Sequence, residues 1–294
     1  MPSNSPTPRK RQQAEPHTLY VVATPIGNLD DITLRAIAVL QTADIIAAED
    51  TRQTGILLKA YGIETRLISY HEHNEQRRAG ELLSKLEAGA AVALVSDAGT
   101  PTISDPGYRL VCAAAAAGIA VVPLPGVSAA TAALSVSGLP TDAFAFIGFL
   151  EKKAGKRKKQ LAELAGRRET LIFYESPRRL TALLTDVLDC LGDRPAVLGR
   201  EMTKQHEEFI RGPVSRLLAE LAGRESVKGE CTLLVAGRQP DDGPADPEAV
   251  RAEIRRRLAS GETGTTAVSK QVADMFGIPK KEAYALVLEI KGGR

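Results

Sequence analysis

Three loops of the chain combine glycine, proline and polar residues in a way that suits a small polar ligand. They span residues 24–31, 96–107 and 123–130. The middle loop carries two Pro, two Gly and two Asp in twelve residues, more than a plain connection needs. Gly27 and Gly126 allow a ligand to approach the backbone, and Asp97 can bond a ribose hydroxyl or an amine. The first and third loops are equally typical of turns in which Asn28 and Ser128 cap a helix.

Two groups of ionisable residues are candidates for acid–base chemistry. Glu49, Asp50 and Arg52 lie within four residues, either as a proton acceptor beside a cation or as a capped helix start with an ion pair. Glu175 follows a later apolar run and is a further candidate. His71 and His73 can place two imidazoles on one face of a strand, but no partner motif accompanies them, so no metal is expected.

The segment from Glu151 to Arg168 is strongly basic. It has eight cationic side chains against two carboxylates, a net charge of +6 compared with +2 for the whole chain. Such a run is typical either of a solvated helix face or of a contact with a polyanion. The candidates for phosphate contact are Arg52, Lys156, Arg157, Lys158 and Lys159.

The elements that position these residues follow from short apolar runs. Such runs fit strands buried on both faces of a parallel sheet. Helical patterns alternate with them, so the sequence predicts an α/β domain whose ligand-binding loops follow the strands. The expected strands of this first half are 19–23, 45–48, 66–69, 92–95 and 119–122.

A second alternating region follows the Gly138–Thr141 stretch. Its expected strands are 144–149, 171–174, 196–198 and 232–236, and its expected helices are 156–164, 178–191 and 214–221. Three further helices are expected at 247–259, 266–276 and 280–290, in a helix-turn-helix-like spacing. The predicted organisation is therefore a disordered arm over 1–16, domains over 17–138 and 139–238, and a helical module over 247–294.

Composition limits the class of protein. The chain has 294 residues, 44% of them hydrophobic and 25% charged, which is typical of a globular protein of about two domains. Trp is absent and aromatics are 4%, which argues against an aromatic stacking surface for single strands. The three cysteines are interpreted as buried thiols in a reducing cytosol. No secretory or membrane-spanning segment is predicted, which fits a cytoplasmic location.

Several motifs occur in order and resemble a known family. They are Thr24-Pro25-Ile26-Gly27-Asn28-Leu29, Glu49-Asp50-Thr51-Arg52, His71-Glu72-His73-Asn74-Glu75, the 96–107 loop, Tyr174-Glu175-Ser176 and Lys228-Gly229-Glu230. Together they are similar to the bacterial small-subunit ribosomal RNA (cytidine-2′-O)-methyltransferases of the tetrapyrrole methylase superfamily. The likeness covers Thr18 to Gly237, and Glu151 departs from it, because the family usually has Pro there.

The resemblance implies a two-domain tetrapyrrole-methylase-like fold, with a mainly parallel first sheet and a mixed second sheet. It implies S-adenosylmethionine as methyl donor, held in the cleft between the two domains. The residues that match the donor-binding loops are Pro25, Gly27, Asn28, Asp97, Ala98, Gly99, Thr100, Pro101, Gly126, Val127, Ser128 and Ala129. In the second half, loop equivalence adds Glu175, Thr203 and Glu230.

The reaction implied is 2′-O-methylation of a cytidine ribose in the decoding region of small-subunit ribosomal RNA, as free RNA or as an assembled 30S subunit, by a homodimer. A proton acceptor would assist the weakly nucleophilic hydroxyl, and the candidates are Asp50, Glu49 and Glu175, in that order. Three alternatives stay open: a tetrapyrrole C-methyltransferase, a non-enzymatic ligand-sensing nucleic-acid-binding protein, and a nucleotide-binding oxidoreductase. The absence of a G-x-G-x-x-G motif disfavours the last of these.

Overall fold

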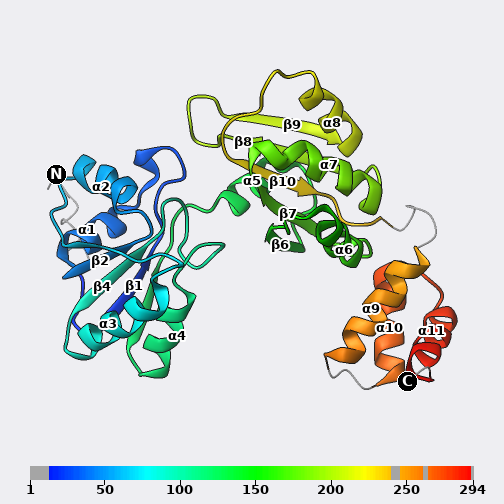
Figure 1. The fold of residues 1–294 in the computed structure, drawn as a ribbon, viewed down its shortest axis with the longest axis horizontal. Coiled ribbons are helices and arrows are strands. Elements are labelled where there is room, and N and C mark those ends of the chain that lie inside the picture. The colour runs from blue at the N-terminus through cyan, green and yellow to red at the C-terminus, as the bar shows by residue number, and fades with distance from the viewer. Residues whose placement is uncertain (1–12, 240–245, 261–263, 293–294) are drawn as a thin grey trace, which may run out of the picture. The chain divides into compact units, whose positions relative to one another are not determined.

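The computed structural model describes residues 13–239, 246–260 and 264–292. They form two compact units, residues 1–129 and 130–294, which are described separately below (Figure 1). This division precedes the Gly138–Thr141 stretch, so the domain limits expected from the sequence stay a prediction. Most of the expected N-terminal arm lies outside the described residues.

The first unit is built on a five-stranded parallel sheet. The strands are β1 (Thr18–Val22), β2 (Ile45–Ala48), β3 (Leu67–Ser69), β4 (Ala91–Val95) and β5 (Ala120–Leu124). Their order is β3-β2-β4-β1-β5, and every pairing is parallel. Leu19 is in register with Val92 of β4 and with Val121 of β5. The parallel sheet expected from the apolar runs is therefore confirmed.

Helices cover both faces of this sheet. They are η1 (Leu29–Asp31), α1 (Leu34–Thr42), α2 (Thr51–Ala60), α3 (Glu75–Glu87) and α4 (Tyr108–Ala116). Tyr20 of β1 packs in one hydrophobic cluster with residues of α1 and α2, such as Val39 and Leu57. Leu19, its neighbour, packs in the other cluster with Leu82 of α3 and residues of α4. Because both faces are buried at the central strands β2, β4 and β1, these strands consist of apolar runs, whereas β3 and β5 at the two edges are more exposed.

The second unit contains a mixed sheet. Its strands are β6 (Phe144–Phe149), β7 (Thr170–Glu175), β8 (Pro195–Arg200), β9 (Glu208–Pro213) and β10 (Cys231–Val235). Their order is β6-β7-β10-β8-β9, in which only β6 and β7 pair in parallel. The expectation of a mixed sheet is confirmed. Strand β9 has no counterpart among the strands expected from the sequence.

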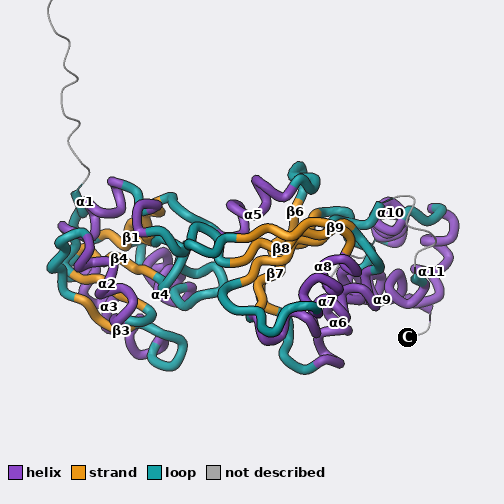
Figure 2. Tube along the Cα trace, turned by 90° about the horizontal axis from the view of Figure 1, so that it is seen from above, coloured by secondary structure: helices purple, strands orange, loops and turns teal. Residues whose placement is uncertain are grey.

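One face of this sheet carries the main core of the second unit. The helices that accompany this sheet are α5 (Ala129–Ser137), α6 (Ala154–Leu164), α7 (Pro177–Leu191) and α8 (Val214–Ala222). Leucines of α6, α7 and α8 pack against Phe173 and Leu233 of the sheet. Figure 2 shows α6, α7 and α8 on one side of the strands and α5 on the other. Two contacts place α5 over the second face: Ala130 N donates to Tyr174 Oη at 3.1 Å, and Arg211 Nη2 donates to Val136 O at 2.8 Å.

The C-terminal helices have a core of their own. They are α9 (Pro247–Ala259), α10 (Thr265–Phe276) and α11 (Lys280–Gly292). Val250, Ile254, Val268 and Val287 are buried between them. Helix α10 ends at Gly277, whose φ of 64° is in the left-handed region that favours glycine. No helix within the described residues is long and apolar enough to cross a membrane.

Candidate active site

The three glycine- and proline-rich loops of the first unit lie against one another. Thr24 N donates to Gly99 O at 2.8 Å, and Gly99 N donates to Thr24 O at 3.0 Å. The Thr100 hydroxyl donates to Val127 O at 3.3 Å. The loops follow β1, β4 and β5, which are neighbours in the sheet. The structure therefore brings together the three segments that the sequence analysis assigned to the methyl donor.

These loops offer small, accessible backbone. Gly27, Asn28 and Gly126 are exposed, whereas Pro25 and Gly99 are buried. A Cβ at position 126 would lie 2.8 Å from Ala23 Cβ, so the packing of the two loops requires glycine there. Asn28 caps η1 by accepting from Asp30 N at 3.1 Å, so the capping interpretation of this residue holds as well.

Backbone strain is concentrated in two of the candidate ligand-binding loops. Five described residues other than glycine have positive φ, and four of them lie in these loops. Thr102 and Ser104 have φ of 74° and 68° in the first unit, and Glu201 and Thr203 have φ of 50° and 67° in the second. Non-glycine residues rarely adopt this conformation, and such strain is typical of functional segments.

A cavity of about 540 Å³ opens beside these loops in the first unit, and the sequence analysis missed it. Its lining includes Glu49, Glu75, Asp105 and Arg109. Burial, together with the charges of Asp105 and Asp97, raises the pKa of Glu49 to about 7. Burial, together with the charge of Asp97, raises the pKa of Asp105 to about 6. These carboxyls come from strand ends about fifty residues apart in sequence, so no local pattern marks the cluster.

Asp50 has a different role from its neighbour Glu49. It caps α2 by accepting from Arg52 N at 2.8 Å, and its carboxylate pairs with the Arg52 guanidinium at 2.6 Å. The bonds from Arg52 lower the pKa of Asp50 to about 2, so its carboxylate is a weak base. The structure thus favours the capped helix start over the proton acceptor for Asp50. Its backbone N–H also donates to Asp97 Oδ1 at 2.9 Å, which joins the ends of β2 and β4.

The three candidate residues of the second unit lie near one edge of its sheet. Cys231 of β10 pairs with Glu175 of β7 on one side and with Arg200 of β8 on the other, and Glu230 precedes it. Glu230 Oε2 accepts from Lys204 Nζ at 3.1 Å. Thr203 donates its N–H to Glu207, and its buried hydroxyl has no hydrogen-bond partner.

Glu175 is buried and paired. Its side chain is 1% exposed, with Oε2 2.9 Å from Arg179 Nη2. Its Oε1 accepts from Ser176 N at 2.7 Å. Oε1 is therefore hydrogen-bonded, whereas Oε2 is ion-paired with Arg179 but forms no hydrogen bond within the described residues. The neighbouring guanidinium favours a positioning role over that of a proton acceptor.

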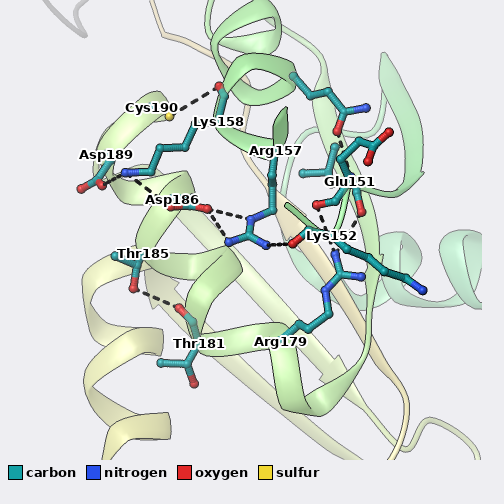
Figure 3. A network of polar contacts seen from close by, with 12 residues as sticks. Glu151, Lys152, Arg157, Lys158, Arg179, Thr181, Thr185, Asp186, Asp189 and Cys190 are labelled. Carbon is teal, nitrogen blue, oxygen red and sulfur yellow. Dashed lines mark hydrogen bonds and ion pairs between the residues drawn. The ribbon is translucent and has the colours of Figure 1, made fainter. Parts of the chain in front are cut away.

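The basic segment needs a correction at Arg157. This side chain is buried, and its guanidinium pairs with Asp186 of α7 at 2.6 Å, as Figure 3 shows. Lys158 pairs with Asp189 of α7 at 2.8 Å. Arg157 is therefore a structural residue that holds α6 on α7 and is inaccessible to RNA phosphate. Lys158 is also exposed but is paired with α7, so the exposed lysine set is defined as Lys152, Lys153, Lys156 and Lys159.

The remaining chemical candidates of the sequence have ordinary roles. The His71 and His73 rings lie edge to face with centroids 6.0 Å apart, and His71 Nε2 lies 3.1 Å from Asn74 Nδ2. Among the described residues, no group of three or more His, Cys, Asp or Glu side chains is placed to hold a metal ion. All three cysteines are free, but only Cys231 is buried; Cys112 is exposed.

Comparison with known proteins identifies the family. Residues 18–218 match the model of the Tetrapyrrole (Corrin/Porphyrin) Methylases. The chain is 50% identical over 275 residues to a Synechocystis protein named Ribosomal RNA small subunit methyltransferase I, with 93% of this chain and 98% of that protein covered. It is 48% identical over 278 residues to an Escherichia coli O157:H7 protein of the same name, with 93% and 96% covered.

Solved structures show the same fold. A uroporphyrin-III-C-methyltransferase from Thermus thermophilus superimposes with a TM-score of 0.55 at 22% identity, covering 74% of this chain and 94% of that one. A diphthine synthase superimposes with a TM-score of 0.58 at 14% identity, covering 76% and 90%. The family match and the near-full-length relatives show that this chain is a methyltransferase of the tetrapyrrole methylase family.

Proposed function

We propose that the protein transfers a methyl group from S-adenosylmethionine to the ribose 2′-hydroxyl of a cytidine in small-subunit ribosomal RNA. The observation that carries this proposal is the likeness, along nearly the whole chain, to relatives named as small-subunit ribosomal RNA methyltransferases. The likeness to a tetrapyrrole methyltransferase is limited to the fold, so a tetrapyrrole substrate is not favoured.

The residues present fit the methyl donor. In the first unit, the linked loops 25–28, 97–101 and 126–129 would hold it against exposed backbone, with Asp97 available to its hydroxyl or ammonium groups. In the second unit, the Thr203 hydroxyl is buried without a partner, which is unfavourable unless a ligand supplies one. When bound, S-adenosylmethionine supplies a methyl group already activated by its sulfonium.

Glu49 is the proton acceptor that the structure favours. Its pKa of about 7 leaves a substantial fraction ionised at neutral pH, yet keeps the carboxylate basic enough to take a proton from a hydroxyl. Asp50 lacks that basicity, and Glu175 is ion-paired with Arg179. We therefore place Glu49 ahead of Asp50 and Glu175 in this role.

The exposed lysine set and Arg52 are the proposed RNA phosphate contacts. The Arg52 side chain is 88% exposed although it pairs with Asp50. A ribosomal substrate implies a cytoplasmic location, and a homodimer remains a prediction from the family.

Methyl transfer to RNA tests the proposal directly. The protein is incubated with tritium-labelled S-adenosylmethionine and either unmodified 30S subunits or free small-subunit RNA. We expect label in the RNA at a cytidine whose 3′ phosphodiester resists alkali, because a methylated 2′-hydroxyl cannot attack it. Absence of label from both substrates would contradict the proposed function, and label at an alkali-sensitive site would contradict ribose methylation.

A further inference from the structure

Strand β6 carries an unusual share of the aromatic residues. Three of the six phenylalanines of the chain lie in it: Phe144, Phe146 and Phe149. Phe144 is 45% exposed and Phe149 is 58% exposed. Because an exposed Phe such as Phe149 contributes little to the core, the residues around it are considered for a role in binding.

Phe149 is a rigid surface ring. Tyr174 of the neighbouring strand β7 packs against it edge to face, with ring centroids 5.7 Å apart, and Phe146 packs on the same tyrosine at 4.9 Å. The tyrosine is itself held, because its hydroxyl accepts from Ala130 N at 3.1 Å. The next residue, Leu150, is buried. Phe149 thus packs against Tyr174 while more than half of the residue's surface is exposed.

The loop that follows Phe149 is fixed as firmly. Arg179 donates to Leu150 O at 3.0 Å, and Arg157 donates to Lys152 O at 3.4 Å (Figure 3). Glu151 N, which a proline would lack, donates to the Gln160 side chain of α6 at 2.9 Å. Each of these arginines is held in turn by a buried carboxylate, so the backbone that presents the lysines does not depend on those lysines.

The charge of this loop complements a polyanion. Lys152 and Lys153 are exposed, and within the described residues neither forms an ion pair. Lys156 follows with a side chain that is 66% exposed, and its Nζ lies 3.8 Å from Glu151 Oε1, the carboxylate of this loop. An exposed ring that is followed within four residues by two lysines without an ion pair supplies the two features that a nucleotide contact uses, an apolar face for the base and cations for the phosphate. A second copy of this chain would bring the same cations against these and be repelled.

We propose that Phe149, with Lys152 and Lys153, forms a platform on which an unpaired base of the substrate RNA stacks while its phosphates contact the lysines. This proposal rests on the RNA substrate proposed above and adds a nucleotide contact in the second unit. The low aromatic content of the chain argued against base stacking. A single exposed ring is enough for one stacked base, however, and β6 contains half of the phenylalanines of the chain.

The absence of Trp from the chain provides a direct probe. The variant Phe149→Trp contains a single indole, whose fluorescence a stacked base quenches. The matched control is Phe144→Trp, at the other end of the same strand. The probes are an eight-residue oligocytidylate and an abasic ribose-phosphate oligomer of equal length. We expect quenching of Phe149→Trp by the oligocytidylate alone, and no quenching of Phe144→Trp by either probe.

Affinity provides the second measurement. Phe149→Ala is expected to weaken oligocytidylate binding by about 5- to 150-fold, the usual loss for one base–aromatic stack, whereas Phe144→Ala leaves it unchanged. Equal quenching by the abasic oligomer, or equal losses in both alanine variants, would overturn the proposal. A spectrum that shifts with protein concentration alone would also overturn it, by identifying a second copy as the occupant. Because neither measurement uses methyl transfer, failure here is distinct from failure of the proposed function.

Discussion

Replacing Glu49 by Gln is expected to slow methyl transfer strongly while stabilising the fold. The amide keeps the shape of the side chain but cannot accept a proton. Loss of a positioned general base usually lowers kcat by about 10²- to 10⁴-fold. With a pKa of about 7, about a tenth of the Glu49 side chains are ionised at pH 6 and about nine tenths at pH 8. The wild-type rate should therefore rise about ninefold over that interval.

The effect on stability has the opposite sign. The folded state raises the pKa of Glu49 from 4.5 to about 7, so it binds this proton more tightly than the unfolded chain does. Stability from this group is complete below pH 4.5 and is lost as the pH rises through 7. The full shift corresponds to roughly 3 kcal/mol, which solvent screening of the half-buried side chain reduces to about 1–2 kcal/mol. The Gln variant avoids that loss, so its first unit should melt roughly 3–6 °C higher than wild type at pH 8.

Two measurements on Glu49→Gln test whether Glu49 accepts the proton and whether its buried charge destabilises the fold. Single-turnover transfer to unmodified 30S subunits is followed from pH 6 to 8, and melting is followed at pH 8 and pH 4.5. The exposed Glu87→Gln at the end of α3 is the control and should change neither quantity. An unchanged rate together with equal melting temperatures at pH 8 would refute the assignment of Glu49. A raised melting temperature with an unchanged rate would confirm the buried charge but assign the proton to another group.

Four further outcomes follow from the structure. Arg157→Ala leaves Asp186 buried without its partner, so urea denaturation should show roughly 3–5 kcal/mol less stability in the second unit; an unchanged midpoint would contradict this. Thr203→Val should weaken donor binding roughly two- to tenfold by calorimetry without lowering the melting temperature, since its hydroxyl has no partner in the free protein. Gly126→Ala forces a Cβ to within 2.8 Å of Ala23 Cβ and should cost about 1–3 kcal/mol by denaturant unfolding. Replacing the exposed lysine set by Ala should lower the slope of log affinity for single-stranded RNA against log salt by up to roughly 3, with donor affinity unchanged.

The sequence allowed the layers of the fold to be predicted, because burial on both faces leaves an uninterrupted apolar run such as Val92–Val95. Strand β9 was missed because it lacks such an apolar run. It lies at the edge of its sheet and alternates between buried Ile210 and exposed Arg211, and Gly212 and Pro213 follow directly. The composition of the three loops after β1, β4 and β5 singled them out as candidates for a small polar ligand, whereas their assignment to the methyl donor came from the family resemblance and stays a prediction.

Electrostatic properties could not be predicted from local sequence. Arg157 stands in a run of basic residues and looks like its neighbours, yet its partner Asp186 lies 29 residues away on α7. The pKa of Glu49 depends on Asp97 and Asp105, which follow a different strand. Asp50 and Glu49 are adjacent in sequence and have opposite pKa shifts, since Asp50 is bonded to a guanidinium whereas Glu49 is buried and faces carboxylates.

The central position of β1 has a consequence for the order in which the first unit matures on the ribosome. β1 is the first strand to be synthesised, but its neighbours β4 and β5 are the last two of the sheet. Thr18 pairs with Ala91 and with Ala120, so the emerging apolar strand has no lateral partner until most of the unit has been translated. Such non-local parallel pairing is slow to form and leaves the strand open to aggregation in the meantime. The loop after β1 is therefore the earliest part of the proposed donor site to be translated and among the last to take its final shape.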